Sequence, residues 1–182
     1  MERGMDFLRA QVNNAVMQHE SFCKALEEHE EQAEDPRFRD LCARFRPIMT
    51  EHQRMIERYA DSIDAESAGG GAKKLFGKAA GVARDLADAT RESDFLRLVG
   101  DIVMSRQSED TFKTFREAGR MLGDAELQRI GEACERDHDQ YAEAANRLVQ
   151  QMFVEHVRDV QPGQGTSASA RGTTGDVRET RL

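Results

Sequence analysis

Residues 111–138 read TFKTFREAGRMLGDAELQRIGEACERDH, and the fold prediction starts from this stretch. Two amphipathic arms flank Gly123 and Asp124. Glycine commonly ends a helix, because it adopts the left-handed conformation without steric cost, and aspartate commonly begins one by accepting hydrogen bonds from free N–H groups. The pattern therefore predicts a helical hairpin, with one helix over about 93–122, a tight turn, and a second helix over about 125–158.

A second hairpin is predicted at the beginning of the chain. Over residues 5–34 the apolar side chains follow each other at steps of four and three, the seam of a bundle helix. Asp35-Pro36 ends this helix and starts the next, which we expect to reach about residue 64. Pro47 lies inside that second helix and should bend it or loosen one turn.

Two helical hairpins joined by one long connection have the connectivity of a ferritin-like bundle. The connection, residues 65–92, contains three consecutive glycines and a short basic amphipathic stretch that should form a short helix. We therefore predict an all-α fold, an antiparallel ferritin-like four-helix bundle over 1–160 with its crossover at 65–92. Residues 161–182 have almost no apolar side chains and should form a disordered tail. A hemerythrin-like bundle is disfavoured, because Ile56 and Ala142 stand four residues after two key histidines, where that fold needs His or Glu.

Composition excludes several classes of protein. The formal charge is −8, with 34 acidic against 26 basic side chains, so we expect no general binding of nucleic acid. No apolar run approaches the length of a membrane span and no secretory signal follows Met1. The three cysteines have scattered spacings, typical of reduced thiols. These features predict a cytoplasmic protein that does not bind membranes.

A polar layer interrupts the apolar seam of all four predicted helices. His19, His52, Glu109 and His138 each occupy a position where the seam calls for a core residue. His19 stands 16 residues before the first turn and His52 stands 17 after it, while Glu109 and His138 are equally far from the second turn. Because antiparallel neighbours at equal distance from their turn lie at equal height, we expect the four side chains to converge near the middle of the bundle.

Imidazole nitrogens and carboxylate oxygens together suit iron, manganese or zinc. Bundles that hold two metal ions take one Glu from each of two helices and a Glu-x-x-His pair from each of the others. Glu20, Glu109 and Glu135-x-x-His138 match this pattern, whereas Met49 replaces the glutamate that should precede His52. The predicted metal ligands are thus Glu20 or His19, His52, Glu109, Glu135 and His138, and no catalytic residue is assigned.

Two stretches resemble the ferritin-like superfamily, in particular bacterial ferritin-like stress proteins of the YciE/YciF type. They are AEDPRFRDLCARFRPIMTEHQRMIER at 33–58 and the hairpin at 111–138. The resemblance implies a di-iron-type site in the bundle and a homodimer. Ser105 and Ser108 stand near where that family tends to carry carboxylates.

Two functional hypotheses follow. The first is a metal-binding ferritin-like protein with iron or manganese, or alternatively zinc, acting in iron oxidation or in peroxide and stress defence. The second is a non-catalytic helical bundle that keeps a degenerate metal site as a buried His–Glu network, and binds a protein partner through its crossover or tail. The sequence leaves open whether the protein is an enzyme.

Overall fold

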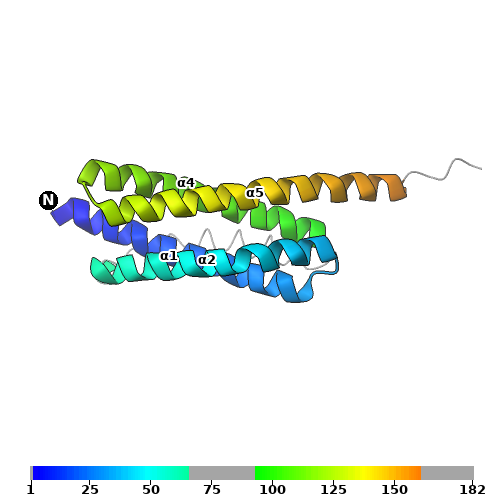
Figure 1. Cartoon of the computed structure of the whole chain (residues 1–182), viewed down its shortest axis with the longest axis horizontal. Coiled ribbons are helices and arrows are strands. Elements are labelled where there is room, and N and C mark those ends of the chain that lie inside the picture. Colours follow the sequence, from blue (N-terminus) through cyan, green and yellow to red (C-terminus); the bar gives the residue numbers. More distant parts are fainter. Residues whose placement is uncertain (1, 66–92, 161–182) are drawn as a thin grey trace, which may run out of the picture.

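The computed structural model describes residues 2–65 and 93–160, and within these ranges every regular element is a helix. The helices are α1 (Glu2–Gln32), α2 (Pro36–Ser62), α4 (Asp94–Leu122) and α5 (Ala125–Val160) (Figure 1). The predicted all-helical class and the four long helices are therefore confirmed. The predicted crossover helix and the predicted tail lie outside the described residues.

The turn chemistry read from the sequence sets the helix ends. Gly123 adopts the left-handed conformation (φ 69°) that ends α4. The Asp124 carboxylate accepts hydrogen bonds from the N–H groups of Glu126 and Leu127, at 3.1 and 2.9 Å, and so caps α5. Asp35 caps α2 in the same way through the N–H of Arg37 at 2.8 Å. α2 continues through Pro47, where its ladder lacks one N–H donor.

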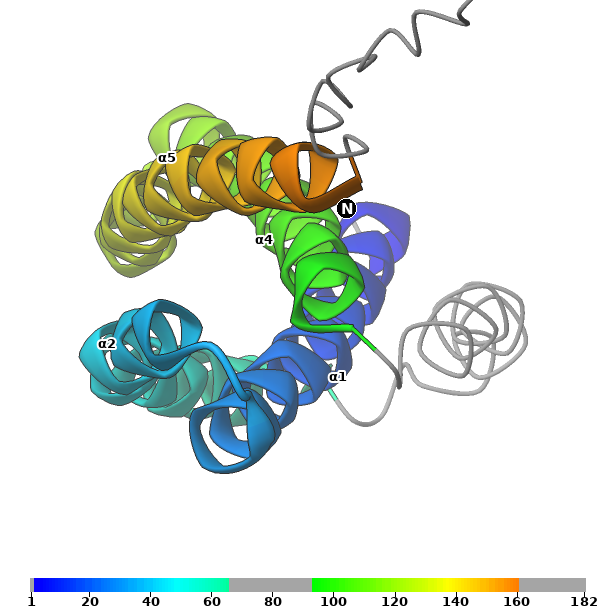
Figure 2. The ribbon, with the colours of Figure 1, turned by 90° about the vertical axis from the view of Figure 1, so that its right-hand side faces the viewer.

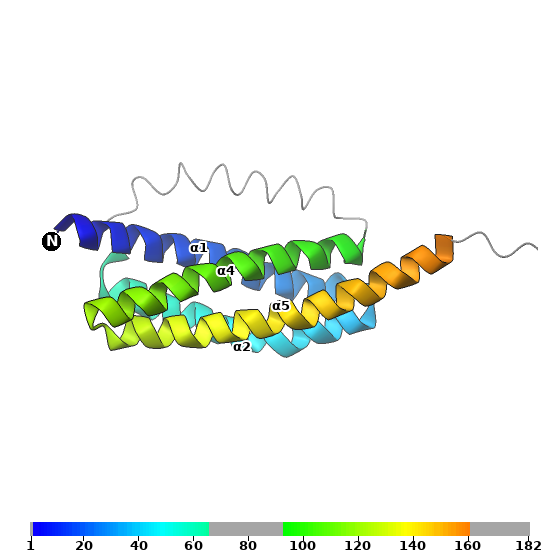
Figure 3. The same ribbon diagram turned by 90° about the horizontal axis from the view of Figure 1, so that it is seen from above.

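The four helices form a ring in which each helix packs mainly against two others. α1 packs against α2 and α4, and α5 packs against α4 and α2, as the end view shows (Figure 2). Seen from above, α5 extends past the ends of its neighbours (Figure 3). None of the described helices has a stretch long and apolar enough to cross a lipid bilayer.

Two glycines bring the backbones of α4 and α5 unusually close together. A Cβ on Gly131 would lie 2.3 Å from the backbone nitrogen of Arg116, and one on Gly119 would lie 2.3 Å from that of Gln128. No side chain fits at such distances, so both positions require glycine. This close seam fixes α5 on α4 as a single unit.

The core consists of two apolar clusters. One surrounds Phe22, Leu26, Phe38 and Tyr141 near the α1–α2 turn. The other surrounds Val12, Ile56, Phe112, Leu127 and Ile130 near the α4–α5 turn. Phe22 from the first cluster and Phe112 from the second both contact the ring of His138, with centroids 5.3 and 5.5 Å away. The buried histidines therefore lie where the two apolar clusters meet.

The glycine seam makes a prediction about stability. Gly131→Ala should lower the free energy of unfolding by about 1–3 kcal/mol, because the added methyl group forces the two backbones apart. Gly100→Ala is the matched control in α4, since a Cβ there meets nothing within 4 Å. That control should be neutral or stabilising by up to about 1 kcal/mol. Urea denaturation measures both; equal stabilities of the two variants would contradict the close approach.

Candidate metal centre

His19, His52 and His138 form a compact buried cluster. Each offers one ring nitrogen, and the three nitrogens all lie within 4.8 Å of one another. The ring centroids of His19 and His138 are 5.1 Å apart, and His52 is 6.2 Å from each. None of the three residues is more than 4% exposed. Three helices, α1, α2 and α5, thus bring one imidazole each to the same point.

Gln53 orients the His19 ring. Its amide nitrogen donates to the Val16 carbonyl at 3.3 Å and to Glu57 at 2.8 Å, so its amide oxygen must face the ring. That oxygen lies 2.9 Å from His19 Nδ1 and can only accept a hydrogen bond. His19 therefore carries its proton on Nδ1, and a lone pair is left on Nε2, a buried atom with no hydrogen-bond partner.

Ser105 orients the His138 ring from α4. Its hydroxyl donates its one hydrogen to the His138 carbonyl at 3.0 Å. The same oxygen lies 3.1 Å from His138 Nδ1 and accepts from it. His138 is thus protonated on Nδ1, and its Nε2 is again buried, unprotonated and without a partner.

Asp137 orients the third ring through the opposite nitrogen. The Asp137 carboxylate lies 3.1 Å from His52 Nε2 and accepts its hydrogen. The lone pair of His52 is then on Nδ1, which has no partner and is buried. Metal-binding histidines characteristically donate their other N–H to a carboxylate, carbonyl or hydroxyl in this way. Each imidazole therefore has one hydrogen-bonded nitrogen and one free lone pair.

Burial keeps the cluster neutral. Desolvation lowers the pKa of His19 to about 4, partly offset by the hydrogen bond to Gln53. Desolvation, reinforced by the two neighbouring histidines, holds the pKa of His138 well below its ordinary value, and desolvation also lowers that of His52. Cys23 Sγ lies 3.6 Å from His19 Nδ1, but burial raises the pKa of this thiol to about 12, so it remains protonated. At pH 7 the cluster presents three neutral imidazoles.

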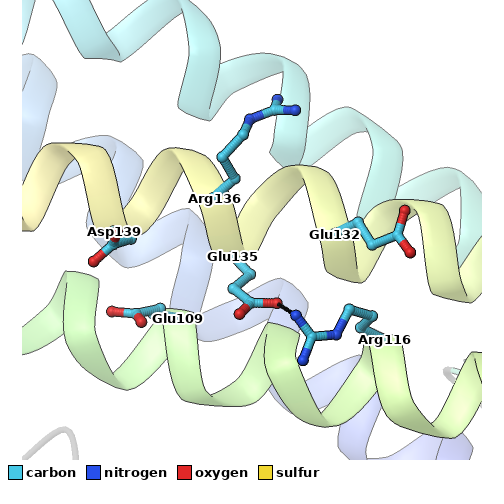
Figure 4. A pocket seen from close by; sticks show the side chains of 6 residues that line it. All are labelled: Glu109, Arg116, Glu132, Glu135, Arg136 and Asp139. Carbon is cyan, nitrogen blue, oxygen red and sulfur yellow. Dashed lines mark hydrogen bonds and ion pairs between the residues drawn. The ribbon is translucent and has the colours of Figure 1, made fainter.

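The three predicted glutamate ligands are engaged elsewhere. Glu20 is exposed on α1 and pairs with Lys24 at 2.6 Å. Glu109 is buried, but its carboxylate pairs with Arg106 and Lys113. Glu135 pairs with Arg116 (Figure 4). None of the three belongs to the histidine group.

Both Glu109 and Glu135 face a pocket along α4 and α5 (Figure 4). The reason is electrostatic, because a carboxylate in the dry core would be costly, while α4 supplies cations beside that pocket. Of the layer expected from the seam, the structure brings together the three histidines and leaves Glu109 outside.

The sequence alone did not identify several hydrogen-bond partners of the buried side chains. Gln53 and Asp137 stand next in sequence to His52 and His138, and only this adjacency hints at their roles. Asp101, fully buried on α4, accepts hydrogen bonds from Tyr141 at 3.1 Å and from His29 at 2.9 Å. His29 and Tyr141 are thus structural side chains that share one buried acidic partner.

Comparison with known proteins gives no family. No protein-family model, no curated protein and no solved structure matches this chain. The site therefore has to be interpreted from its own geometry.

The lowered pKa values predict acid sensitivity in the metal-free protein. Between pH 6.5 and about 4 the histidines of the unfolded chain bind protons, whereas the buried histidines of the folded protein stay unprotonated. The free energy of unfolding therefore falls as pH falls through this window. His19 alone should account for roughly 3 kcal/mol of that loss. Urea denaturation with EDTA at pH 7, 5.5 and 4 measures it. His19→Leu should flatten the curve relative to the His156→Gln control, and parallel curves for the two variants would show that His19 titrates normally.

Proposed function

We propose that this protein binds a single divalent transition-metal ion through His19, His52 and His138. The main support for this proposal is the set of three buried lone pairs, each on an imidazole whose other nitrogen is hydrogen-bonded. A buried nitrogen without a partner is costly. Three of them, on rings that each bring one nitrogen within 4.8 Å of the other two, have a common explanation if a cation binds to all three rings.

The ligand set favours particular metals. Imidazole suits zinc, iron, copper and nickel, whereas manganese and magnesium prefer carboxylate or water oxygens. We therefore favour Fe(II) or Zn(II) over manganese. Three protein ligands leave coordination positions open, and a bound ion would supply Lewis acidity there.

A single ion fits the residues better than two. Oxidation of iron or removal of peroxide at a di-metal centre would need bridging carboxylates. Glu109 and Glu135, on which that expectation depended, are paired with Arg106, Lys113 and Arg116. A ferritin-like relationship and a role in iron or peroxide stress remain proposals that rest on the sequence resemblance.

The competing proposal is a metal-free helical bundle with a relic site, which acts by binding another protein. Its support is the neutrality of the cluster, because three uncharged rings can be accommodated in a core of Phe22 and Phe112 without a metal. This proposal predicts that apolar replacements at the cluster are neutral or stabilising in every buffer.

Metal stoichiometry separates the two proposals. After loading with Fe(II) under anaerobic conditions, or with Zn(II), elemental analysis should find one ion per chain. Metal at 100 times its dissociation constant should stabilise the fold by about 2.7 kcal/mol, or roughly 5–10 °C in Tm. His138→Leu and His52→Leu should abolish both effects.

Two controls sharpen this experiment. His156→Gln removes a histidine outside the cluster and should leave one ion bound. Glu135→Gln should also leave metal content unchanged, whereas a di-metal centre would lose metal in this variant. A wild-type chain that stays metal-free after loading would refute the metal proposal in favour of the relic site.

A further inference from the structure

Three side chains surround the buried cluster, and each of them is hydrogen-bonded to one imidazole. Ser105 is fully buried on α4, where its hydroxyl donates to the His138 carbonyl. Gln53 is a neutral amide held by hydrogen bonds to His19, Val16 and Glu57. Asp137 is the charged member of the three, and its side chain is 14% exposed. Asp137 therefore differs from Gln53 and Ser105 in both charge and solvent exposure.

Asp137 joins the cluster to the protein surface. One of its oxygens, Oδ2, accepts from His52 Nε2. On its other side the guanidinium of Arg136 covers both oxygens, with Nε 2.8 Å from Oδ1 and Nη2 3.2 Å from Oδ2. The Arg136 side chain is 64% exposed and extends from α5 away from α4 (Figure 4). Because the guanidinium lies mostly in solvent, water can replace the carboxylate as its partner when Arg136 moves away.

From this arrangement we propose that Asp137 is the entry point for the metal ion and that Arg136 is its gate. This inference rests on the proposed metal site. When Arg136 swings away, the carboxylate is open to solvent and attracts a cation, which then passes to the lone pairs of the cluster. While Arg136 is in place, its positive charge neutralises Asp137 and repels cations from the same point. The pair thus sets how fast metal enters and leaves.

The location of the path agrees with the packing. Asp137 belongs to α5 and His52 to α2, two helices that come from different hairpins. At the height of the cluster α4 and α5 are joined through the fully buried Ser105, whose hydroxyl lies 3.0 Å from the His138 carbonyl, so this side is closed to an ion. Between α2 and α5, Asp137 and His52 are joined by a side-chain hydrogen bond, which can open without moving a backbone.

The test is the rate of Co(II) uptake by the metal-free full-length protein, followed by stopped-flow absorption at low ionic strength. Arg136→Ala should load roughly three- to tenfold faster than wild type, because it removes a positive charge at the entrance. The difference should shrink when salt is added. Asp137→Asn should load roughly tenfold slower, although its amide oxygen can still accept the hydrogen of His52.

Arg147→Ala is the matched control, with the same charge change on the exposed side of α5. It lies about 16 Å further along the helix and should load like wild type. Equal rates for the two arginine variants, or a wild-type rate for Asp137→Asn, would overturn the gate while leaving the metal site intact. A wild type that takes up no Co(II) would overturn the proposed function, and the gate with it. Final cobalt content distinguishes these results, since it should remain one ion per chain in Arg136→Ala.

Discussion

Hydrogen bonds to one nitrogen of each of three imidazoles organise the centre of this bundle. Gln53, Asp137 and Ser105 each hold one ring by one nitrogen and thereby direct the other nitrogen inward. The core gives those inner nitrogens no partner. Folding stability alone would favour apolar side chains at these positions, and the proposed metal ion would offset the cost of three buried, unpaired nitrogens.

The surrounding structure maintains this arrangement. Two apolar clusters lie on either side of the histidines, and Phe22 and Phe112 contact the rings directly. Gly119 and Gly131 fix α5 against α4, which sets the height of His138 relative to Ser105. Burial lowers the pKa of all three histidines, so the lone pairs are available at neutral pH. The packing therefore positions the three imidazoles, and their lowered pKa values keep one nitrogen of each unprotonated.

The sequence predicted the parts of this structure that depend on local rules. Gly123 and Asp124 fix a turn by their own backbone chemistry, and distances from the turns place the three histidines at one height. The glutamates could not be placed in this way. A spacing of three residues leaves Glu135 about 60° around the helix from His138, and Arg116, on another helix, determines which way it turns. Gln53, Ser105 and Asp137 escaped prediction because their roles depend on contacts between helices.

The tautomers of the three histidines show whether the metal-free protein holds three lone pairs ready for an ion. Long-range ¹H–¹⁵N correlation spectra of the metal-free protein at pH 7 distinguish the two ring nitrogens of each residue. We expect protonation on Nδ1 for His19 and His138 and on Nε2 for His52, with the resonances of the remaining, unprotonated nitrogens shifting when Zn(II) is added. A charged ring, or the opposite tautomer at any of the three residues, would contradict a preformed set of three inward lone pairs.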